Sequence, residues 1–455
     1  MQGMILSNLD ARTPVHGRGQ RAQEIHCPLH RPCGTCTREK NEYPQERKIP
    51  MEKRQADPGS TRPEQSFLDP GRHSSDNQMQ ATHSQATLPP MKVQNQVVSG
   101  AAVGVAMSGG VDSTVAAAIL QEAGYQVHGF FMVLPLADLD KQRQKVTRVA
   151  AQLGIPLTCV DLRKQFTADI IDHCASAYQK GLTPNPCVHC NQHIKFGHLL
   201  QVIQKRGVEW MATGHYAQVV QRGSSAHLLR GKDPAKDQSY FLCRLENHQR
   251  RNLVLPLGEY SKEQVYQKAS DLGLAFKRQE SQDVCFFQKD LGGFLASQGV
   301  QPLRGDIVTT DGRCMGMHNG IWHYTIGQRR GLGLPDTTPW YVVRLDAENN
   351  RVVIGKQEQL VRTKLLMHSV QWNISPRREW QGEVQIRSRH RAAAAKLHEV
   401  GQQRCLITFK KPQRAITPGQ YGVLYNGNHL VGSGIIDTLQ EIEVYNESGC
   451  GNLRL

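Results

Sequence analysis

Two short stretches of the sequence carry residues whose types and spacing predict chemistry. The first, Ala106-Met-Ser-Gly-Gly-Val-Asp-Ser113, joins an apolar run to a helix-forming segment through a Ser-Gly-Gly turn. Such a turn presents backbone N–H groups and a positive helix N-terminus to an anion, and its glycines permit close approach of phosphate oxygens. The lysine of a Walker loop is absent. The stretch therefore predicts phosphate binding without transfer of a γ-phosphate, and Asp112 is a candidate Mg²⁺ ligand.

The second stretch, 181–197, contains the pair Cys187 and Cys190 after two prolines. A helix opening near Asn191 would place Cys190 at a positive helix end, where a thiolate is favoured. Cys285 follows much later, in Ser281-Gln-Asp-Val-Cys-Phe. A lone cysteine is usually a small core residue, so reactive thiols and packing residues are both open interpretations here. The same regions hold histidines that we interpret as surface or packing residues: His128, His189 and His193.

Charge and cysteine content limit the class of protein. The 455-residue chain has a formal net charge of +15 and 12 cysteines. Because the first ninety residues are nearly balanced in charge, the rest of the chain is basic, which favours a polyanionic partner such as nucleic acid; a solvated basic surface is the alternative. No long apolar run and no signal-peptide segment is evident. We therefore expect a cytoplasmic protein with reduced thiols and no membrane partner.

The N-terminal segment differs from the rest in composition. Residues 1–97 are rich in Gln, Arg, Pro, Ser and His and show no strand or helix periodicity, so we predict that they are disordered. Two alternatives stay open: the cysteines and histidines between His26 and Cys36 could ligate zinc, and Met91 could be the start of the protein.

From residue 101 the pattern predicts alternating strands and helices. We expect strands at 101–107, 125–133, 155–162 and 209–216, and helices at 113–124, 141–154 and 196–207. This rhythm predicts an α/β domain with a doubly wound parallel sheet. Beyond Gly299 short β segments take over, with hairpins at 340–355 and 423–436, the second around Asn426-Gly427. We place domain boundaries at 98–293, 294–363 and 364–451, the last being a small β-barrel.

The Ser-Gly-Gly-Val-Asp-Ser motif after a first strand resembles the PP-loop of the ATP pyrophosphatases. These enzymes cleave ATP between the α and β phosphates and activate a carbonyl oxygen as its adenylate. The resemblance implies ATP and Mg²⁺ as cofactors, and it accounts for the missing lysine. A loop that holds the leaving pyrophosphate has less need of a lysine on the γ-phosphate.

Further motifs make the chain similar to the tRNA-specific 2-thiouridylases. They are TPNPCVHCN, ATGHYA, KDQSYFL, ESQDVCF, YTIGQRRGLG and TPGQYGVLYNG, and they extend over about Val98 to Asp437. The resemblance implies a sulfurtransferase that adenylates the C2 oxygen of the wobble uridine and replaces it with persulfide sulfur. It implies the tRNAs for Lys, Glu and Gln as substrates, and a persulfide carrier or cysteine desulfurase as sulfur source.

The same resemblance assigns roles to individual residues. Cys190 matches the nucleophile and Cys285 the persulfide carrier, and Asp112 completes the predicted catalytic set. A Cys190–Cys285 disulfide would remain after sulfur release, for an external reductant to open. The implied ATP contacts are Ala106, Met107, Ser108, Gly109, Gly110, Val111, Asp112, Ser113, Met132 and Gly214. The implied target-base contacts are Asn185, Pro186 and Cys187, and the implied tRNA contacts are His215, Lys236, Asp237, Gln238, Arg387, Ser388 and Gln420.

One departure opens an alternative mechanism. Some members of the family have aspartate where this chain has Cys187, so Cys187, Cys190 and Cys285 could instead give three thiolates to an iron–sulfur cluster with one open iron. Two rival functions also stay open. One is an ATP pyrophosphatase that amidates a carboxylate and needs no paired cysteines, and the other is a non-catalytic RNA-binding protein.

Overall fold

The computed structural model describes residues 100–274, 276, 284–287, 291–335 and 337–437. The predictions of disorder in 1–97, of a zinc site between His26 and Cys36, and of a start at Met91 lie outside these residues. Among the helices of the described residues, none is both long and apolar enough to cross a membrane.

A five-stranded sheet forms the first part of the described chain, in the order β3-β2-β1-β4-β7. Its four neighbouring pairs are all parallel. The predicted parallel sheet is therefore confirmed. The strands are β1 (Ala102–Ala106), β2 (Gln126–Val133), β3 (Leu157–Asp161), β4 (Trp210–Ala212) and β7 (Leu253–Val254).

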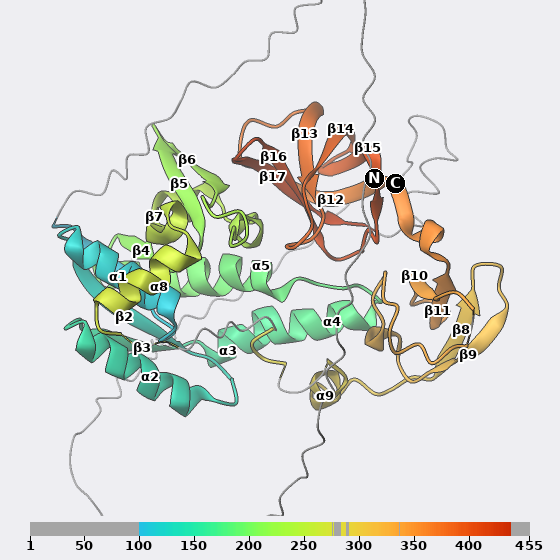
Figure 1. Ribbon diagram of the computed structural model, residues 1–455, viewed down its shortest axis with the longest axis horizontal. Coiled ribbons are helices and arrows are strands. Elements are labelled where there is room, and N and C mark those ends of the chain that lie inside the picture. Colours follow the sequence, from blue (N-terminus) through green and yellow to red (C-terminus); the bar gives the residue numbers. More distant parts are fainter. Residues whose placement is uncertain (1–99, 275, 277–283, 288–290, 336, 438–455) are drawn as a thin grey trace, which may run out of the picture. The chain divides into compact units, whose positions relative to one another are not determined.

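Helices cover both faces of this sheet (Figure 1). The first two, α1 (Val111–Glu122) and α2 (Leu139–Gln152), share one hydrophobic cluster with Val103 and Val105 of β1. Gly104, between those valines, faces the other way, because a Cβ there would lie 2.8 Å from Ile203 of helix α6 (Leu200–Lys205). Alternate residues of one buried strand thus pack against helices on opposite faces.

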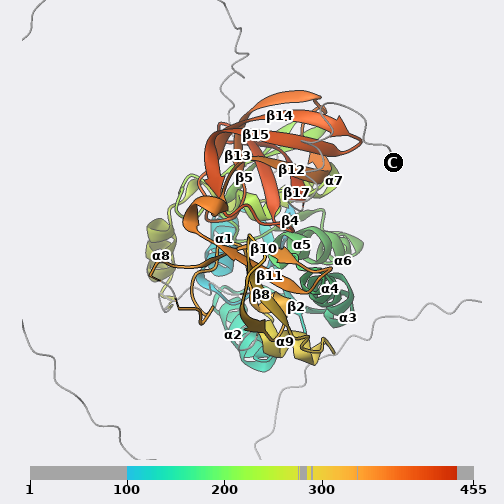
Figure 2. The same cartoon turned by 90° about the vertical axis from the view of Figure 1, so that its right-hand side faces the viewer.

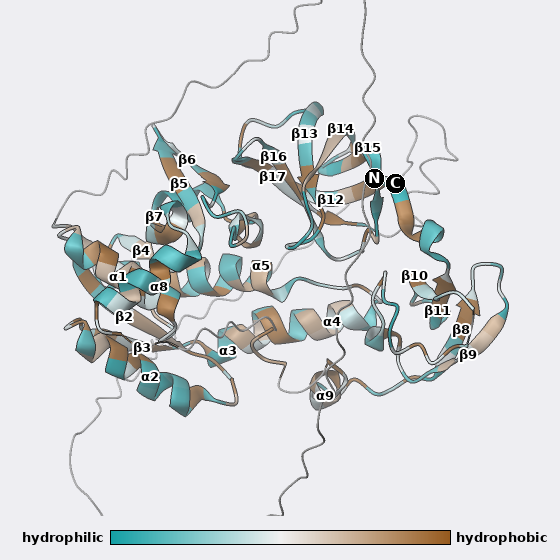
Figure 3. Cartoon of the chain, viewed as in Figure 1, coloured by the Kyte–Doolittle hydropathy of each residue, from teal (hydrophilic) through white to brown (hydrophobic). Residues whose placement is uncertain are grey.

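The helical segments after β3 include two π-helices. The first segment runs through α3, η1 and α4, and the second through α5, η2 and α6, before the chain returns to the sheet at β4. Figure 3 shows hydrophilic and hydrophobic residues alternating along α2 and α4, as expected of helices with one buried side. The bounds are α3 (Arg163–Phe166), η1 (Thr167–Asp172), α4 (His173–Gln179), α5 (Pro186–Cys190) and η2 (Asn191–Leu199).

Short elements lie between strands β4 and β7 of the parallel sheet and between β7 and the later domains. The hairpin of β5 and β6 extends the barrel sheet through a pairing of Leu229 with His429. Helix α8 packs against α1 through a cluster that includes Val115 and Val265. The bounds are β5 (Ala217–Arg222), β6 (Ser225–Arg230), η3 (Ser239–Leu242), α7 (Asn247–Arg251), η4 (Pro256–Glu259), α8 (Lys262–Asp271) and α9 (Leu291–Ser297).

The central part of the chain is a four-stranded sheet in the order β10-β11-β8-β9. Strands β10 and β11 form the predicted hairpin, and β11 pairs with β8 in parallel. The elements are β8 (Gly305–Thr309), β9 (Cys314–His318), η5 (Ile321–His323), β10 (Tyr341–Asp346), β11 (Arg351–Gly355) and η6 (Gln357–Leu360).

The C-terminal part is a closed antiparallel barrel (Figure 2). Six strands follow one another in the order β12-β15-β14-β13-β16-β17, and pairing of β12 with β17 closes the ring, so the predicted barrel is confirmed. Gly427, at φ +56°, makes the predicted turn between β16 and β17. The strands are β12 (Val361–Trp372), β13 (Glu379–Gln385), β14 (Ala393–Gly401), β15 (Arg404–Arg414), β16 (Tyr421–Asn426) and β17 (His429–Ile436).

Candidate active site

The glycine-rich loop between β1 and α1 is held open by its own serines. Ser108 N–H donates to Ser113 Oγ at 3.2 Å, and Ser113 Oγ donates to the carbonyl of Gly110 at 3.1 Å. Gly109 has φ +73°, and a Cβ there would lie 3.1 Å from the backbone of Val146. Gly110 caps α1 without any side-chain hydrogen bond, so the first N–H groups of the helix stay available to an anion.

The other predicted ATP contacts lie at the same edge of the sheet. Ala106 ends β1, Met132 lies near the end of β2, and Gly214 follows β4. Because these strands are parallel neighbours, their carboxyl ends meet at one edge, and the strand order reverses direction at β1. A Cβ on Gly214 would lie 2.7 Å from Ser113 N. The chain after β4 is therefore pressed against the first turn of α1, where a nucleotide phosphate would bind.

The carboxylate of Asp112 is engaged by two residues that the sequence analysis missed. Lys262 Nζ lies 2.7 and 2.9 Å from its two oxygens, and Tyr216 donates its hydroxyl to Oδ1 at 2.7 Å. The Lys262 side chain is only 6% exposed, against 34% for Asp112. A Mg²⁺ ion at Asp112 would therefore compete with Lys262, so we treat magnesium as arriving with ATP as part of the substrate.

The cysteine helix begins earlier than we predicted. Helix α5 starts at Pro186, and Asn185 caps it by accepting a hydrogen bond from Val188 N–H at 3.3 Å. Cys190 is thus the last residue of α5 and leads into η2. The expectation that it lies at a positive helix N-terminus was wrong, because Asn185 followed by proline is itself the start signal.

The three predicted thiols influence one another. Cys187 and Cys285 are exposed, and Cys190 is half-buried. Desolvation by the surrounding protein raises the pKa of all three, that of Cys190 to about 12, with the thiols of Cys285 and Cys187 adding to the increase and Lys195 opposing it. Cys190 and Val284, the residue before Cys285, pack against the same hydrophobic cluster. Within the described residues no group of three His, Cys, Asp or Glu is arranged to hold a metal ion.

A column of histidines packs beside the cysteine helix. The rings of His173 and His189 are stacked with centroids 4.2 Å apart, and His193 lies 4.3 Å from His189 at a tilt. Burial, together with the charges of its two neighbours, lowers the pKa of His189 to about 3. His128 instead stacks on Phe130. These contacts agree with the interpretation of these residues as packing histidines.

Comparison with known proteins identifies the family. The tRNA-specific 2-thiouridylase MnmA of Desulfotalea psychrophila is 43% identical over 338 residues, which cover 73% of this chain and 98% of that protein. The 2-thiouridylase of Syntrophotalea carbinolica is 41% identical, covering 73% of this chain and 97% of that protein. The chain belongs to the tRNA-specific 2-thiouridylase family. Members of this family are sulfurtransferases, so the expectation of an enzyme of this class is confirmed.

Family descriptions of separate domains match most of this 2-thiouridylase-family chain. They are the tRNA methyl transferase HUP domain at 101–289, the tRNA methyl transferase PRC-barrel domain at 293–356 and the aminomethyltransferase beta-barrel domain at 362–436. Among solved structures, the U34-tRNA thiolase NcsA from Methanococcus maripaludis aligns at 17% identity and a TM-score of 0.29, covering 45% of this chain and 66% of that one. That likeness is too distant to carry an argument about the site.

Most residues predicted to contact tRNA are bonded within this 2-thiouridylase-family protein. Asp237 accepts from Arg230 at 2.8 Å, and Gln238 Oε1 accepts from Tyr216 N–H at 3.0 Å. Arg387 donates to the carbonyls of Ile326 and Ala415 and to Thr417. His215 Nδ1 shares a hydrogen bond with the hydroxyl of Thr213, and burial lowers the pKa of His215 well below the usual value. Lys236 and Ser388 are half-buried. The remaining donors of Arg387 and Gln238 could still meet tRNA without loss of these bonds.

Gln420 connects the barrel to the cysteine helix. Its amide donates to the carbonyls of Thr183 at 2.8 Å and Pro184 at 3.2 Å, directly before Asn185. Thr183 N–H in turn donates to Pro418 at 3.0 Å. The predicted target-base residues Asn185, Pro186 and Cys187 thus start from a segment that the barrel holds.

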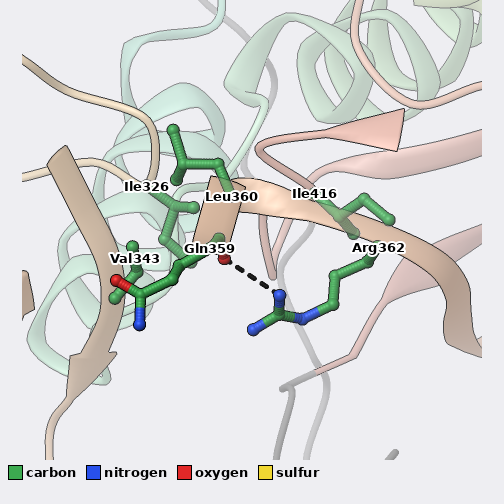
Figure 4. A pocket seen from close by; sticks show the side chains of 6 residues that line it. All are labelled: Ile326, Val343, Gln359, Leu360, Arg362 and Ile416. Atoms are coloured by element: carbon green, nitrogen blue, oxygen red, sulfur yellow. Dashed lines mark hydrogen bonds between the residues drawn. The ribbon is translucent and has the colours of Figure 1, made fainter. Parts of the chain in front are cut away.

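One small cavity lies next to the segments that Arg387 contacts. It has a volume of about 10 Å³ and is lined by Ile326, Val343, Gln359, Leu360, Arg362 and Ile416 (Figure 4). Arg362 donates to the carbonyl of Gln359 at 2.9 Å at its edge. A space of this size holds about one water molecule, so we assign it no ligand.

Proposed function

We propose that this protein replaces the C2 oxygen of the wobble uridine in tRNA with sulfur, at the cost of one ATP. The surroundings of Cys190 support this most directly, because Cys190 and Val284, the residue before Cys285, pack against the same hydrophobic cluster, and the charge of Cys285 raises the pKa of Cys190. Neither an amidating ligase nor a passive RNA-binding protein needs two such thiols close together. Lys, Glu and Gln tRNAs are the proposed substrates.

In the first step the uridine O2 attacks the α-phosphorus of ATP. The O2–P bond forms, the bond to the β-phosphate bridge breaks, and pyrophosphate leaves. The free N–H groups at the start of α1 would hold the pyrophosphate, and Asp112 and Lys262 flank that turn. The wobble base must leave its stack to reach the site, which is least costly in a single-stranded loop.

In the second step sulfur replaces the adenylated oxygen. The terminal sulfur of the Cys285 persulfide attacks C2, and AMP leaves with the oxygen. Cys190 thiolate then attacks the Cys285 sulfur, which breaks the bond to the transferred sulfur and leaves a Cys190–Cys285 disulfide. Two thiols are oxidised and the transferred sulfur is reduced, so an external reductant must reopen the disulfide. A persulfide carrier or cysteine desulfurase would reload Cys285.

Nucleoside mass spectrometry tests this proposal. Unmodified tRNA for Lys, Glu or Gln is incubated with anaerobically purified protein, MgATP and a persulfide donor, and 2-thiouridine and AMP are measured. We expect both products from the wild type, and no 2-thiouridine from Cys190→Ser or Cys285→Ser with tRNA binding within severalfold. Cys159→Ser, an exposed thiol on β3, is the matched control. Indifference to both serine variants would favour the amidating ligase, and absence of AMP from tRNA-binding protein would favour a non-catalytic role.

A further inference from the structure

Helix η2 carries a lysine that the proposed mechanism does not use. Lys195 is half-buried between two fully buried neighbours, Ile194 and Phe196. Within the described part of the chain, no hydrogen bond or ion pair of its ammonium group is found. An ammonium group that is partly withdrawn from water without a counter-charge favours a nearby anion.

The π-helical geometry brings Lys195 towards the face of Cys190. In an α-helix a residue five positions further on lies about 140° around the axis, nearly on the opposite side. A π-helix closes on hydrogen bonds between residues five apart, as Leu200 N–H does with the carbonyl of Lys195. Cys190, the last residue of α5, directly precedes η2 in the continuous helix and lies five residues before Lys195. The wide turns therefore rotate the lysine back towards the thiol.

Side chains from other elements hold these wide turns in place. Gln249 of α7 is 5% exposed and donates to the carbonyls of Gln192 at 2.8 Å and Phe196 at 2.9 Å. Asn191 donates to the carbonyl of Phe241 at 2.9 Å. A π-helix is rare and occurs frequently at functional sites, so its support by two buried amides indicates that the placement of Lys195 is specified.

The charge of Lys195 reaches every thiol of the site. It lowers the pKa of Cys187, Cys190 and Cys285, in each case against the opposing effect of burial. The thiols of the other two cysteines act in the opposite direction and raise the pKa of Cys190. Lys195 also lowers the pKa of His215, the residue after Gly214. It is thus the cation that the thiols and the nucleotide edge of the sheet share.

We propose that Lys195 is the counter-cation of the sulfur anion in this reaction, stabilising the Cys190 thiolate as it attacks the sulfur of Cys285. The catalytic role of Lys195 rests on the proposed function. The pairing of Lys195 with the Cys190 thiolate rests on the structure alone. In that step the Cys190 proton goes to solvent, the Cys190–Cys285 bond forms, and the bond from Cys285 to the transferred sulfur breaks. Its electron pair leaves with that sulfur.

The test measures the thiolate directly, without tRNA or ATP. Carboxamidomethylation of Cys190 is followed by peptide mass spectrometry between pH 7 and 10 in the full-length protein. Below its pKa a thiol reacts in proportion to its thiolate fraction, so log rate rises with pH on a line of unit slope. We expect Lys195→Met and Lys195→Gln to displace this line downward by about tenfold or more, and Lys195→Arg to restore it.

Lys205→Met is the control, because Lys205 is an exposed lysine on the following helix, α6. It should leave the alkylation line unchanged. An unchanged rate in both neutral Lys195 variants, with a wild-type circular dichroism spectrum, would overturn the proposal. A raised KM for ATP with unaltered alkylation would also overturn it, since the lysine would then serve a phosphate. If the Lys195 variants are alkylated more slowly but the wild-type protein makes no 2-thiouridine, the proposed function is refuted and the assignment of Lys195 as counter-cation of Cys190 still stands.

Discussion

The ion pair between Asp112 and Lys262 gives an asymmetric prediction for stability. Asp112→Asn removes the counter-charge of the Lys262 ammonium group, whose side chain is only 6% exposed. Lys262→Met removes the counter-charge of the Asp112 carboxylate, whose side chain is 34% exposed. Removing one partner of a buried pair costs about 3–5 kcal/mol. We expect the lower end for Asp112→Asn, because the rings of Tyr216 and Tyr266 lie 5.5 and 5.2 Å from the lysine.

Lys262→Met should cost less, since Asp112 keeps its hydrogen bond from Tyr216 and its access to water. A lost charge-assisted bond of this kind is worth about 1–2 kcal/mol. The difference of about 1–2 kcal/mol corresponds to about 2–8 °C in the thermal midpoint of a domain of this size. Asp112→Asn combined with Lys262→Met removes both charges and should melt above Asp112→Asn alone.

Circular dichroism melts of the three variants check this ranking. The control is Glu122→Gln. Glu122 forms an ion pair with Lys268 that joins the same two helices, and the two side chains are 51% and 28% exposed, respectively. Such an exposed pair contributes about 0–1 kcal/mol, so its midpoint should stay near that of the wild type. If Asp112→Asn melts at or above Lys262→Met, the argument from burial is wrong.

Two further predictions concern the surroundings of the cysteine helix. Gln420→Ala should lower kcat for thiolation with little change in KM for tRNA, because its amide holds the carbonyls of Thr183 and Pro184; a raised KM with constant kcat would instead support a tRNA contact. Gln413→Ala, a buried barrel glutamine that bonds within its own strand, is the control. The second prediction follows from the pKa of His189, which is lowered to about 3 in the folded protein. In the unfolded chain this histidine takes up a proton below about pH 6.5, so acid favours the unfolded state. The thermal midpoint should therefore decrease from that pH towards pH 3, and His189→Phe should flatten the decrease; an equal slope in both proteins would contradict the assignment.

Local patterns were enough to predict the sheet and the barrel. The apolar run around Val103 and Val105 predicted a buried strand, and Gly124 and Gly154, both at positive φ, end α1 and α2 where the sequence placed those helix ends. Asn426-Gly427 predicted its hairpin for the same reason, because the turn requires a backbone conformation that glycine adopts without strain. These features depend on residues that are close in sequence.

Features that join distant segments were not predictable in this way. Lys262 meets Asp112 across 150 residues, and nothing in the local sequence around either residue specifies the other. The π-helix η2 was not predicted for a different reason. Its hydrophobic pattern resembles that of an ordinary helix, and the hydrogen bonds to its carbonyls come from Gln249, which is distant in sequence. The sequence placed Cys190 at the wrong end of a helix because the Asn185-Pro186 start signal was taken for a turn.

The position of Lys262 also bears on how this loop, which lacks a lysine, would hold the phosphate that we propose for it. Asp112 lies in the first turn of α1, where an acidic side chain suits the helix dipole but repels a bound phosphate. Pairing with Lys262 cancels that charge, while Tyr216 fixes the carboxylate away from solvent on one side. A phosphate bound at this turn would meet the uncapped N–H groups of α1 and an electrically neutral pair. A Cβ on Gly214 would lie 2.7 Å from Ser113 N, so the chain after β4 leaves no room for a side chain beside this turn. Lys262 instead reaches Asp112 from α8 and neutralises its charge.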